Sequence, residues 1–491
     1  MSENGQPASS GRATMATMTL DPAAAYAALV SRDRRFDGRF FVAVTTTGIY
    51  CRPICRVRTP KPTSCRFFEN AAAAESAGFR PCLRCRPELA PGVSLVDSPD
   101  ALARAAARLL DAGAGDTGLG AVAARVGVTE RHLRRVFAAH YGVTPVEWLQ
   151  TQRLLLAKRL LTETAMPIAE VALAAGFHSL RRFNSLFRER YRLAPTQLRR
   201  DAPAAGSDGL TLALDYRPPY AWDAILGFLR ARAVPGVEQV IDDCYRRIVR
   251  LAVAGGELRG WIGVCHAAER SQLLLTIDPG LRRGLAPLLA GVRRQFDLDC
   301  DPQRVSAALG ELAAREPGLR LPGSIDSFEQ AVRAILGQQV SVAAATTLAG
   351  RMAQSLGMPV DSGHTGLTHA FPDAARVAAA TEGDFTALGI LATRARSIQA
   401  LARALVAGDL RLDPEAPVEP TLQQLRALPG IGEWTAQYIA LRCLSWPDAF
   451  PHTDLIIRRA FPGRTPREVL ADAECWRPWR GYATLHLWRQ S

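Results

Sequence analysis

Residues 45–58 read TTTGIYCRPICRVR and residues 79–86 read FRPCLRCR, which places two close pairs of cysteines near the start of the chain. The pairs are Cys51 with Cys55 and Cys82 with Cys85. Four such thiols are the ligand set of a tetrahedral zinc ion, and zinc with four thiolates carries a net negative charge. Arginine surrounds both pairs, which favours a role beside an anion such as phosphate. A structural zinc knuckle with a basic rim is the alternative that the spacing leaves open.

The stretch from Arg35 to Glu88 resembles the N-terminal domain of the Ada family of bacterial alkylation-response proteins. The motifs that carry the resemblance are TTGIYCRPICRVR and GFRPCLRCRP. The resemblance implies that Cys51 is both a zinc ligand and a nucleophile, which takes a methyl group from a methylphosphotriester in DNA once per molecule. It also implies phosphate contacts from Thr47, Arg58 and Arg80. Cys65 lies outside the motif and is expected to be an ordinary thiol.

The implied chemistry suits a zinc-bound sulfur. Only a thiolate is a good nucleophile, and zinc keeps the sulfur deprotonated at neutral pH. Methylation turns one thiolate into a thioether and removes one negative charge from the cluster. Repulsion from the DNA backbone then falls, so that damage is read out as tighter DNA binding.

Length and charge limit the function classes. The chain has 491 residues, too many for one core, and its formal charge of +13 favours a polyanionic partner. A basic surface without such a partner is the alternative that charge alone leaves open. No run of 18 apolar residues exists, and residues 1–19 lack the apolar core of a signal peptide. The ten cysteines, four in a metal pattern and the rest scattered, favour a reducing cytosol over a disulfide framework.

An internal repeat lies between two linker-like stretches, residues 86–94 and 201–209. Its two copies are about 50 residues apart in sequence. Val122, Gly127, Leu133, Phe137, Tyr141 and Pro145 align with Val171, Gly176, Phe183, Phe187, Tyr191 and Pro195. Each copy predicts a short helix, a glycine turn and a second helix with apolar residues every four positions.

The second helix of each copy also carries basic residues, as a recognition helix in a DNA major groove does. They are Arg131, Arg134 and Arg135 in the first copy and Arg181 and Arg182 in the second. A helical bundle with a charged surface is the alternative. The segment AEVALAAGFHSLRRFNSLFRERYRLAPTQLRR resembles the AraC family of transcription regulators, and the likeness covers about residues 101–200.

The C-terminal half contains LPGIGEWTAQY at residues 428–438, which predicts a helix–hairpin–helix. Gly430, Ile431 and Gly432 of the hairpin are candidate contacts to a DNA phosphate through backbone N–H groups. With FPHTDLII around Asp454, RAILGQQVSVAAA at 333–345 and CWRPWRGYATLHLW at 475–488, the hairpin resembles the AlkA family of 3-methyladenine DNA glycosylases. The string PCHR, the hallmark of a second methyltransferase domain in Ada relatives, is absent.

The resemblance assigns roles to several residues. Asp454 is the implied catalytic carboxylate, and Trp434, Tyr438 and Trp488 are the implied aromatic contacts of a flipped, cationic base. Gln338 and Gln339 are implied DNA contacts, and Gln339 stands where a relative has an intercalating leucine. Glycosylase/lyases of the superfamily carry a lysine where this chain has Trp434, so the expected chemistry is hydrolysis alone. Asp448 is the next candidate should Asp454 fail.

The sequence therefore predicts a multidomain, mainly α protein. The expected units are a zinc-bound α+β domain at 20–90, an all-α double helix-turn-helix at 97–200, an α/β domain at 210–315 and an all-α helix–hairpin–helix glycosylase domain at 316–491. We expect one zinc ion per chain, a monovalent cation at the hairpin, and duplex DNA and RNA polymerase as partners of a monomer in the bacterial cytoplasm. A transcription activator whose glycosylase half is a non-catalytic scaffold is the rival interpretation.

Overall fold

In the computed structural model, which describes residues 21–92, 101–199, 210–253 and 255–490, the cysteine-bearing segment folds around a small sheet. The strand order is β3-β1-β2-β4, and β4 pairs parallel to β2, which ends at Cys51. Asp21 begins the unit as the N-cap of α1, since its carboxylate accepts two backbone N–H groups. The elements are α1 (Pro22–Ser31), η1 (Arg34–Phe36), β1 (Phe41–Val44), β2 (Ile49–Cys51), η2 (Pro62–Ser64), β3 (Cys65–Phe68), α2 (Ala71–Ser76), β4 (Arg80–Pro81) and η3 (Pro87–Leu89).

The repeat predicted from the sequence forms two helix-turn-helix units joined by the long helix α6. Gly127 and Gly176 occupy the two turns with φ of 76° and 83°, a conformation that favours glycine. The aligned rings of Phe137 and Phe187 are fully buried. The elements are α3 (Ala101–Asp111), η4 (Ala114–Thr117), α4 (Leu119–Arg125), α5 (Glu130–Tyr141), α6 (Pro145–Glu163), α7 (Ile168–Ala174), α8 (Leu180–Tyr191) and α9 (Pro195–Leu198).

The third unit is a five-stranded antiparallel sheet in the order β5-β9-β8-β7-β6. Alternate residues of its strands point into a core with α10 and α11, as in Leu273, Leu275 and Ile277 of β9, which are fully buried. The elements are β5 (Leu210–Asp215), α10 (Trp222–Arg230), β6 (Glu238–Ile241), β7 (Cys244–Val253), β8 (Gly256–Ala267), η6 (Ala268–Arg270), β9 (Gln272–Ile277), η7 (Pro279–Gly284) and α11 (Leu285–Gln295).

One disulfide corrects the expectation that the scattered cysteines are free thiols. Cys244 and Cys265 are bonded, with their Cα atoms 4.5 Å apart. They lie directly opposite each other because β7 and β8 pair in the register Tyr245 to Val264. A sequence separation of 21 residues matches no recognised cysteine motif, so only the strand register brings these two together.

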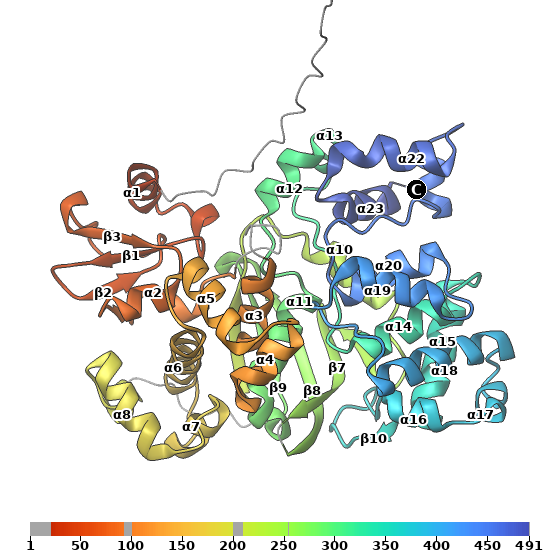
Figure 1. The fold of residues 1–491 in the computed structure, drawn as a ribbon, viewed down its shortest axis with the longest axis horizontal. Helices are drawn as coiled ribbons and strands as arrows, with labels where there is room; N and C mark the ends of the chain where they lie inside the picture. Colours follow the sequence, from red (N-terminus) through yellow and green to blue (C-terminus); the bar gives the residue numbers. More distant parts are fainter. Residues whose placement is uncertain (1–20, 93–100, 200–209, 254, 491) are drawn as a thin grey trace, which may run out of the picture.

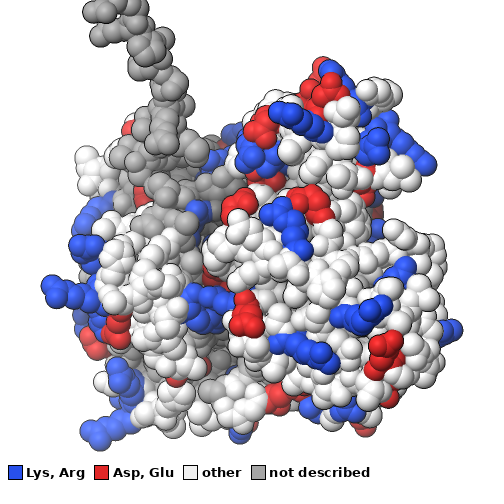
Figure 2. Space-filling model, turned by 45° about the vertical axis from the view of Figure 1, so that its right-hand side comes forward, with Lys and Arg blue, Asp and Glu red and all other residues white. Residues whose placement is uncertain are grey.

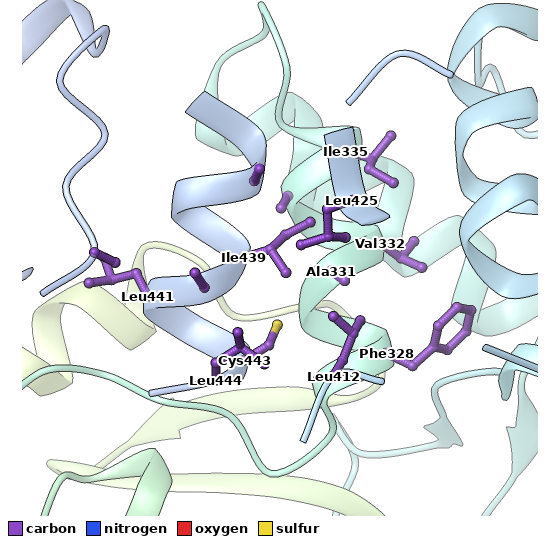
Figure 3. Packing of buried hydrophobic residues seen from close by; sticks show 14 of the residues in the cluster. Phe328, Ala331, Val332, Ile335, Leu412, Leu425, Ile439, Leu441, Cys443 and Leu444 are labelled. Carbon is purple, nitrogen blue, oxygen red and sulfur yellow. The ribbon is translucent and has the colours of Figure 1, made fainter. Parts of the chain in front are cut away.

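The fourth unit is almost wholly helical. Figure 3 shows its centre, where Ala331 and Ile335 of α14 face Leu425 of α19 and Ile439 of α20. Its elements are α12 (Pro302–Leu309), α13 (Glu311–Ala314), α14 (Ser327–Leu336), α15 (Val342–Leu356), β10 (Met358–Pro359), β11 (His369–Ala370), α16 (Ala374–Ala379), α17 (Glu382–Ala387), α18 (Ala392–Ala407), α19 (Val418–Ala427), α20 (Glu433–Cys443), α21 (Leu455–Ala460), α22 (Pro466–Asp472), η8 (Ala473–Trp476) and α23 (Arg480–Arg489).

The four units pack against one another. In Figure 1 the cysteine-bearing unit and α8 lie on one side of the large sheet, and the helices of the fourth unit lie on the other. One hydrophobic cluster includes Leu161 of α6 and Phe187 of α8 together with Leu212 and Ile262 of the sheet. The multidomain, mainly helical architecture expected from the sequence is confirmed. The predicted starts at 20 and 97 and ends at 200 and 491 lie outside the described residues.

Figure 2 shows how charge is distributed over one face of the molecule. On the side drawn in Figure 2, basic side chains are scattered among acidic and uncharged ones. Among the described residues, no helix combines the length and apolar character needed to cross a bilayer.

Candidate active site and metal centre

The structure brings the four motif cysteines to one point. The sulfur atoms of Cys51, Cys55, Cys82 and Cys85 all lie within 4.8 Å of one another. A tetrahedral zinc ion with Zn–S bonds of about 2.3 Å requires sulfur atoms about 3.8 Å apart, so the donor set and its size fit zinc. Cys51, Cys55 and Cys82 are buried and Cys85 is half-buried. In the zinc-bound protein these four residues would hold the ion.

Arg52 ties this cluster to the rest of the molecule. Its backbone N–H donates to the sulfur of Cys85 at 3.3 Å, which lowers the nucleophilicity of that sulfur. Its side chain is 3% exposed and forms ion pairs with Asp37 and with Asp215 of β5, the latter at 2.5 Å. The residue that follows Cys51 is therefore anchored to the large sheet.

A second buried connection leads from the cluster to the helix-turn-helix units. The hydroxyl of Tyr50 and the hydroxyl of Thr151 on α6 both donate to the carboxylate of Glu75, at 3.0 and 3.2 Å. Burial raises the pKa of Glu75 to about 7, against the lowering effect of these hydrogen bonds. Nearby, Lys158 of α6 pairs with Glu88 at 2.5 Å.

The other predicted contacts of the first unit lie at or near its surface. Thr47 and Arg58 are exposed and Arg80 is half-buried. On the recognition-type helices, Arg131, Arg134, Arg135, Arg181 and Arg182 are all exposed. Arg134 pairs with Glu130 one turn earlier, and Arg135 contacts the ring of His132 at 3.1 Å.

Asp454 is the centre of a convergent set of donors in the fourth unit. Its Oδ1 accepts from the backbone N–H groups of Ile456 and Ile457 at 2.9 and 3.3 Å, so it caps α21. The indole Nε1 of Trp488 also donates to Oδ1, at 3.2 Å. The indole Nε1 of Trp434 donates to Oδ2 at 2.7 Å. Four N–H groups from three chain segments thus fix this carboxylate.

The predicted aromatic residues adjoin that carboxylate. Trp434 and Tyr438 stack with ring centroids 5.2 Å apart and an angle of 10° between the planes, one turn apart on α20. Tyr438 and Trp488 lie 6.1 Å apart at 44°. Stacked aromatic faces are electron-rich and bind cationic heterocycles.

Sequence reasoning missed the basic groups behind Tyr438. The guanidinium of Arg442 donates to the Tyr438 hydroxyl at 2.9 Å. Burial alone raises the pKa of Tyr438, but the positive charges of Arg442, Arg232 and Arg333 outweigh it and lower that pKa. The spacing of Arg442 four residues after Tyr438 on a predicted helix was a signal for this contact.

The hairpin and the loop after α14 are joined. Gln338 donates to the carbonyl of Gly430 and to the hydroxyl of Thr435, both at 2.9 Å, which occupies its amide nitrogen. Gln339 is exposed at the tip of this loop with a φ of 53°, a conformation that few residues other than glycine adopt. The side chain of Gln338 therefore holds the loop to the hairpin, whereas that of Gln339 is exposed to solvent.

The two hairpin glycines are not equivalent. Gly430 has a φ of 74°, and a Cβ there would collide with the Ser397 hydroxyl. Gly432 has extended backbone angles and open space around it, so its conformation does not require glycine. Ile431 between them is buried. Only Gly430 is needed for the shape of the turn.

Asp448, the second-choice carboxylate from the sequence, is buried and bound by two arginines. It is 4% exposed, and both its oxygens accept from Arg480, at 2.8 and 2.7 Å. Arg477 donates to it as well, at 2.7 Å. This carboxylate holds the start of α23 in place.

Comparison with known proteins matches four family models in succession. They are the "metal binding domain of Ada" at residues 24–88, a "helix-turn-helix domain" at 122–201, the "AlkA N-terminal domain" at 211–326 and the "HhH-GPD superfamily base excision DNA repair protein" at 332–465. A curated protein of Mycobacterium tuberculosis, the "probable bifunctional transcriptional activator/DNA repair enzyme AlkA", is 40% identical over 486 residues. The match covers 94% of this chain and 95% of that protein.

This chain belongs to the AlkA-type family of bifunctional transcriptional activator/DNA repair enzymes. Two further curated proteins are similar to separate parts of this chain. The "DNA-3-methyladenine glycosylase 2" of Escherichia coli is 45% identical over 56% of this chain and 95% of its own length. The "bifunctional transcriptional activator/DNA repair enzyme Ada" of Escherichia coli is 40% identical over 30% of this chain and 41% of its own.

Proposed function

We propose that the fourth unit is a DNA glycosylase that excises alkylated purines such as 3-methyladenine by hydrolysis of the N-glycosidic bond. The observation that carries this proposal is the fixed carboxylate of Asp454 beside the rings of Trp434, Tyr438 and Trp488. The rings stack on the flipped, cationic base, and the carboxylate stabilises the positive charge that develops on the sugar.

The two carboxylate oxygens of Asp454 differ in how many further hydrogen bonds they can accept. Oδ1 already accepts three N–H groups, whereas Oδ2 accepts only the indole of Trp434 among the described residues. A carboxylate oxygen accepts about two strong hydrogen bonds, so Oδ2 is the one with room for a water or the sugar. In the proposed reaction water adds to the sugar C1′, the C1′–N bond breaks, and its electron pair passes to the base. Oδ2 accepts the proton that the water loses.

The absence of lysine supports hydrolysis without strand cleavage. Residues 210–491 contain no lysine in their sequence, so this half cannot form the lysine Schiff base that a lyase step requires. N-alkylation makes the base a good leaving group, and no strong general acid is needed beside it.

We further propose that Cys51 is the methyl acceptor of the first unit. Its sulfur attacks the methyl carbon of a phosphotriester, the C–O bond breaks, and the electron pair stays on the phosphate oxygen. Bound zinc would keep the attacking sulfur deprotonated. Thr47, Arg58 and Arg80 are assigned to the phosphate, and the exposed arginines of α5 and α8 to promoter DNA.

The rest of the functional assignment follows from these two activities. Duplex DNA is the partner of all the DNA-binding residues, including the hairpin at Gly430, Ile431 and Gly432 and the loop at Gln338 and Gln339. We assign RNA polymerase as the partner of the activator units, a monomeric state, and a place with the nucleoid in the bacterial cytosol. The monovalent cation at the hairpin is proposed on family resemblance alone.

A base-release assay separates this proposal from the scaffold interpretation. Full-length protein is incubated with a duplex that contains one 3-methyladenine or 7-methylguanine, and the free base is measured against time. Release of more than one base per chain supports a catalytic glycosylase half. Release no faster than the spontaneous rate would leave only a DNA-binding scaffold.

A further inference from the structure

A basic cleft lies where the cysteine-bearing unit, α6 and the large sheet meet. Its volume is about 740 Å³, within the usual range of ligand-binding pockets. Its walls come from chain segments far apart in sequence, including Arg34 of η1, Arg56 and Arg84 beside the cysteines, and Arg270 of η6. The cleft exists because the first and third units are packed together; neither forms it alone.

The acidic residues of the cleft are already paired. Asp215 accepts from Arg52 at 2.5 Å and from Gln272 at 2.8 Å. Glu163 accepts from Arg86 at 2.5 Å and from Arg159 at 3.2 Å. The negative charges of these two carboxylates are balanced by the arginines that bind them. They do not neutralise the other arginines of the cleft.

Four arginines of the cleft have no acidic partner in the described part of the chain. The guanidinium of Arg34 donates to the backbone carbonyl of Arg270, and Arg56, Arg84 and Arg270 are exposed and form no ion pair there. Like charges gathered around one cavity repel each other, and a bound anion removes that cost. Guanidinium groups bind phosphate oxygens in bidentate fashion.

We propose that this cleft is a second phosphate-binding site, which takes a polyanionic phosphate ester through Arg34, Arg56, Arg84 and Arg270. None of the described residues that line it is aromatic, so the ligand is held by its phosphates and not by stacking of a base. Thr47, Arg58 and Arg80, the residues assigned to the methylphosphotriester, do not line it either. The phosphates come either from a DNA strand that passes between sensor and glycosylase or from a free polyphosphate ligand.

Two variants of the full-length, zinc-loaded protein test this proposal. The cleft variant carries Arg56→Gln, Arg84→Gln and Arg270→Gln. The matched control variant carries Arg283→Gln, Arg315→Gln and Arg403→Gln, which are likewise exposed and without an ion pair among the described residues. Each variant loses three positive charges. The two variants therefore have the same net charge and differ only in where on the protein the charges are removed. Zinc content and thermal unfolding check that both fold.

The first measurement titrates tripolyphosphate into each protein by calorimetry at low salt. The second measures binding of an undamaged duplex at several salt concentrations. If the ligand is free polyphosphate, the cleft variant binds tripolyphosphate at least tenfold more weakly than the control variant, and the salt slopes of the two agree. If the ligand is a DNA strand, the slope of log K against log salt falls by about 2–3 in the cleft variant only, since each lost phosphate contact contributes about 0.9. Equal behaviour of the two variants in both measurements overturns the proposal.

Discussion

The substitution Asp454→Asn separates the chemical role of this residue from its structural one. Asparagine caps a helix as well as aspartate does, so its oxygen keeps the bonds to Ile456, Ile457 and Trp488. Its amide nitrogen then faces the indole N–H of Trp434, and two donors cannot bond to each other. The 2.7 Å hydrogen bond of Trp434 is lost. We expect the free energy of unfolding to fall by about 1 kcal/mol, towards the lower end of the cost of an unsatisfied donor, because Trp434 is only partly buried.

The effect on catalysis is expected to be larger. Loss of one preorganised charged or general-base group lowers a rate by about 10²–10⁴-fold, or about 2.7–5.4 kcal/mol in activation free energy. The loss should be smaller for cationic 7-methylguanine than for a neutral base, because a better leaving group needs less stabilisation. The assay is single-turnover release of the base from a defined duplex with enzyme in excess, beside urea unfolding of the same preparations.

Trp434→Phe is the matched control. It removes the same hydrogen bond but leaves the carboxylate in place, so we expect it to reproduce the loss of stability and to lower excision by about tenfold at most. Excision by Asp454→Asn at the rate of wild type, or at the rate of Trp434→Phe, would refute the assignment of Asp454 as the catalytic carboxylate.

Four further predictions concern other parts of the molecule. Cys55→Ser should abolish zinc binding and unfold the first unit, because the binding free energy of a small zinc module is its folding free energy; a variant that keeps one zinc per chain by atomic absorption contradicts the ligand set. Arg52→Met should lower the free energy of unfolding by about 3–5 kcal/mol by leaving two buried carboxylates unpaired, while Arg35→Met at an exposed pair should change it little in the same denaturation experiment. The raised pKa of Glu75 means that its folded form holds the proton more tightly than its unfolded form, so its contribution to stability is complete below pH 4.5 and is lost as the pH rises towards 7. Glu75→Gln should flatten the measured stability over that window, and an unchanged pH profile would show that this carboxyl does not titrate there. Gln339→Ala should slow base excision and leave the stability unchanged, since in the proposed role this exposed side chain contacts DNA when a base is flipped; equal single-turnover rates contradict that role.

Periodicity and spacing predicted the elements that depend on local sequence. The two helix-turn-helix units follow from apolar residues every four positions, such as Phe183 and Phe187, together with a glycine in each turn. The metal cluster follows from the spacing of its cysteines, because short loops bring such pairs together. Asp454 before a run of apolar residues is also a helix-capping pattern. In the structure the same carboxylate caps α21 and accepts hydrogen bonds from the indoles of Trp434 and Trp488.

The contacts between distant segments could not be predicted in this way. The indole of Trp488 reaches Asp454 across 34 residues, and Arg52 reaches Asp215 across 163, and both depend on how whole units pack. The disulfide of Cys244 with Cys265 depends on the register of two strands. In each case the pairing is set by tertiary geometry, to which no local pattern corresponds.

The central claim is that one chain both accepts a methyl group at Cys51 and releases alkylated bases through Asp454. Its most direct test is one incubation of full-length, zinc-loaded protein with a methylated duplex that carries both phosphotriesters and 3-methyladenine. Peptide mass spectrometry and chromatography of free bases are applied to the same sample. We expect Cys51 to gain the mass of one methylene, at most once per chain, while the released base exceeds one per chain. A methyl group on Cys85 or on no cysteine, or base release at the spontaneous rate, would contradict the account.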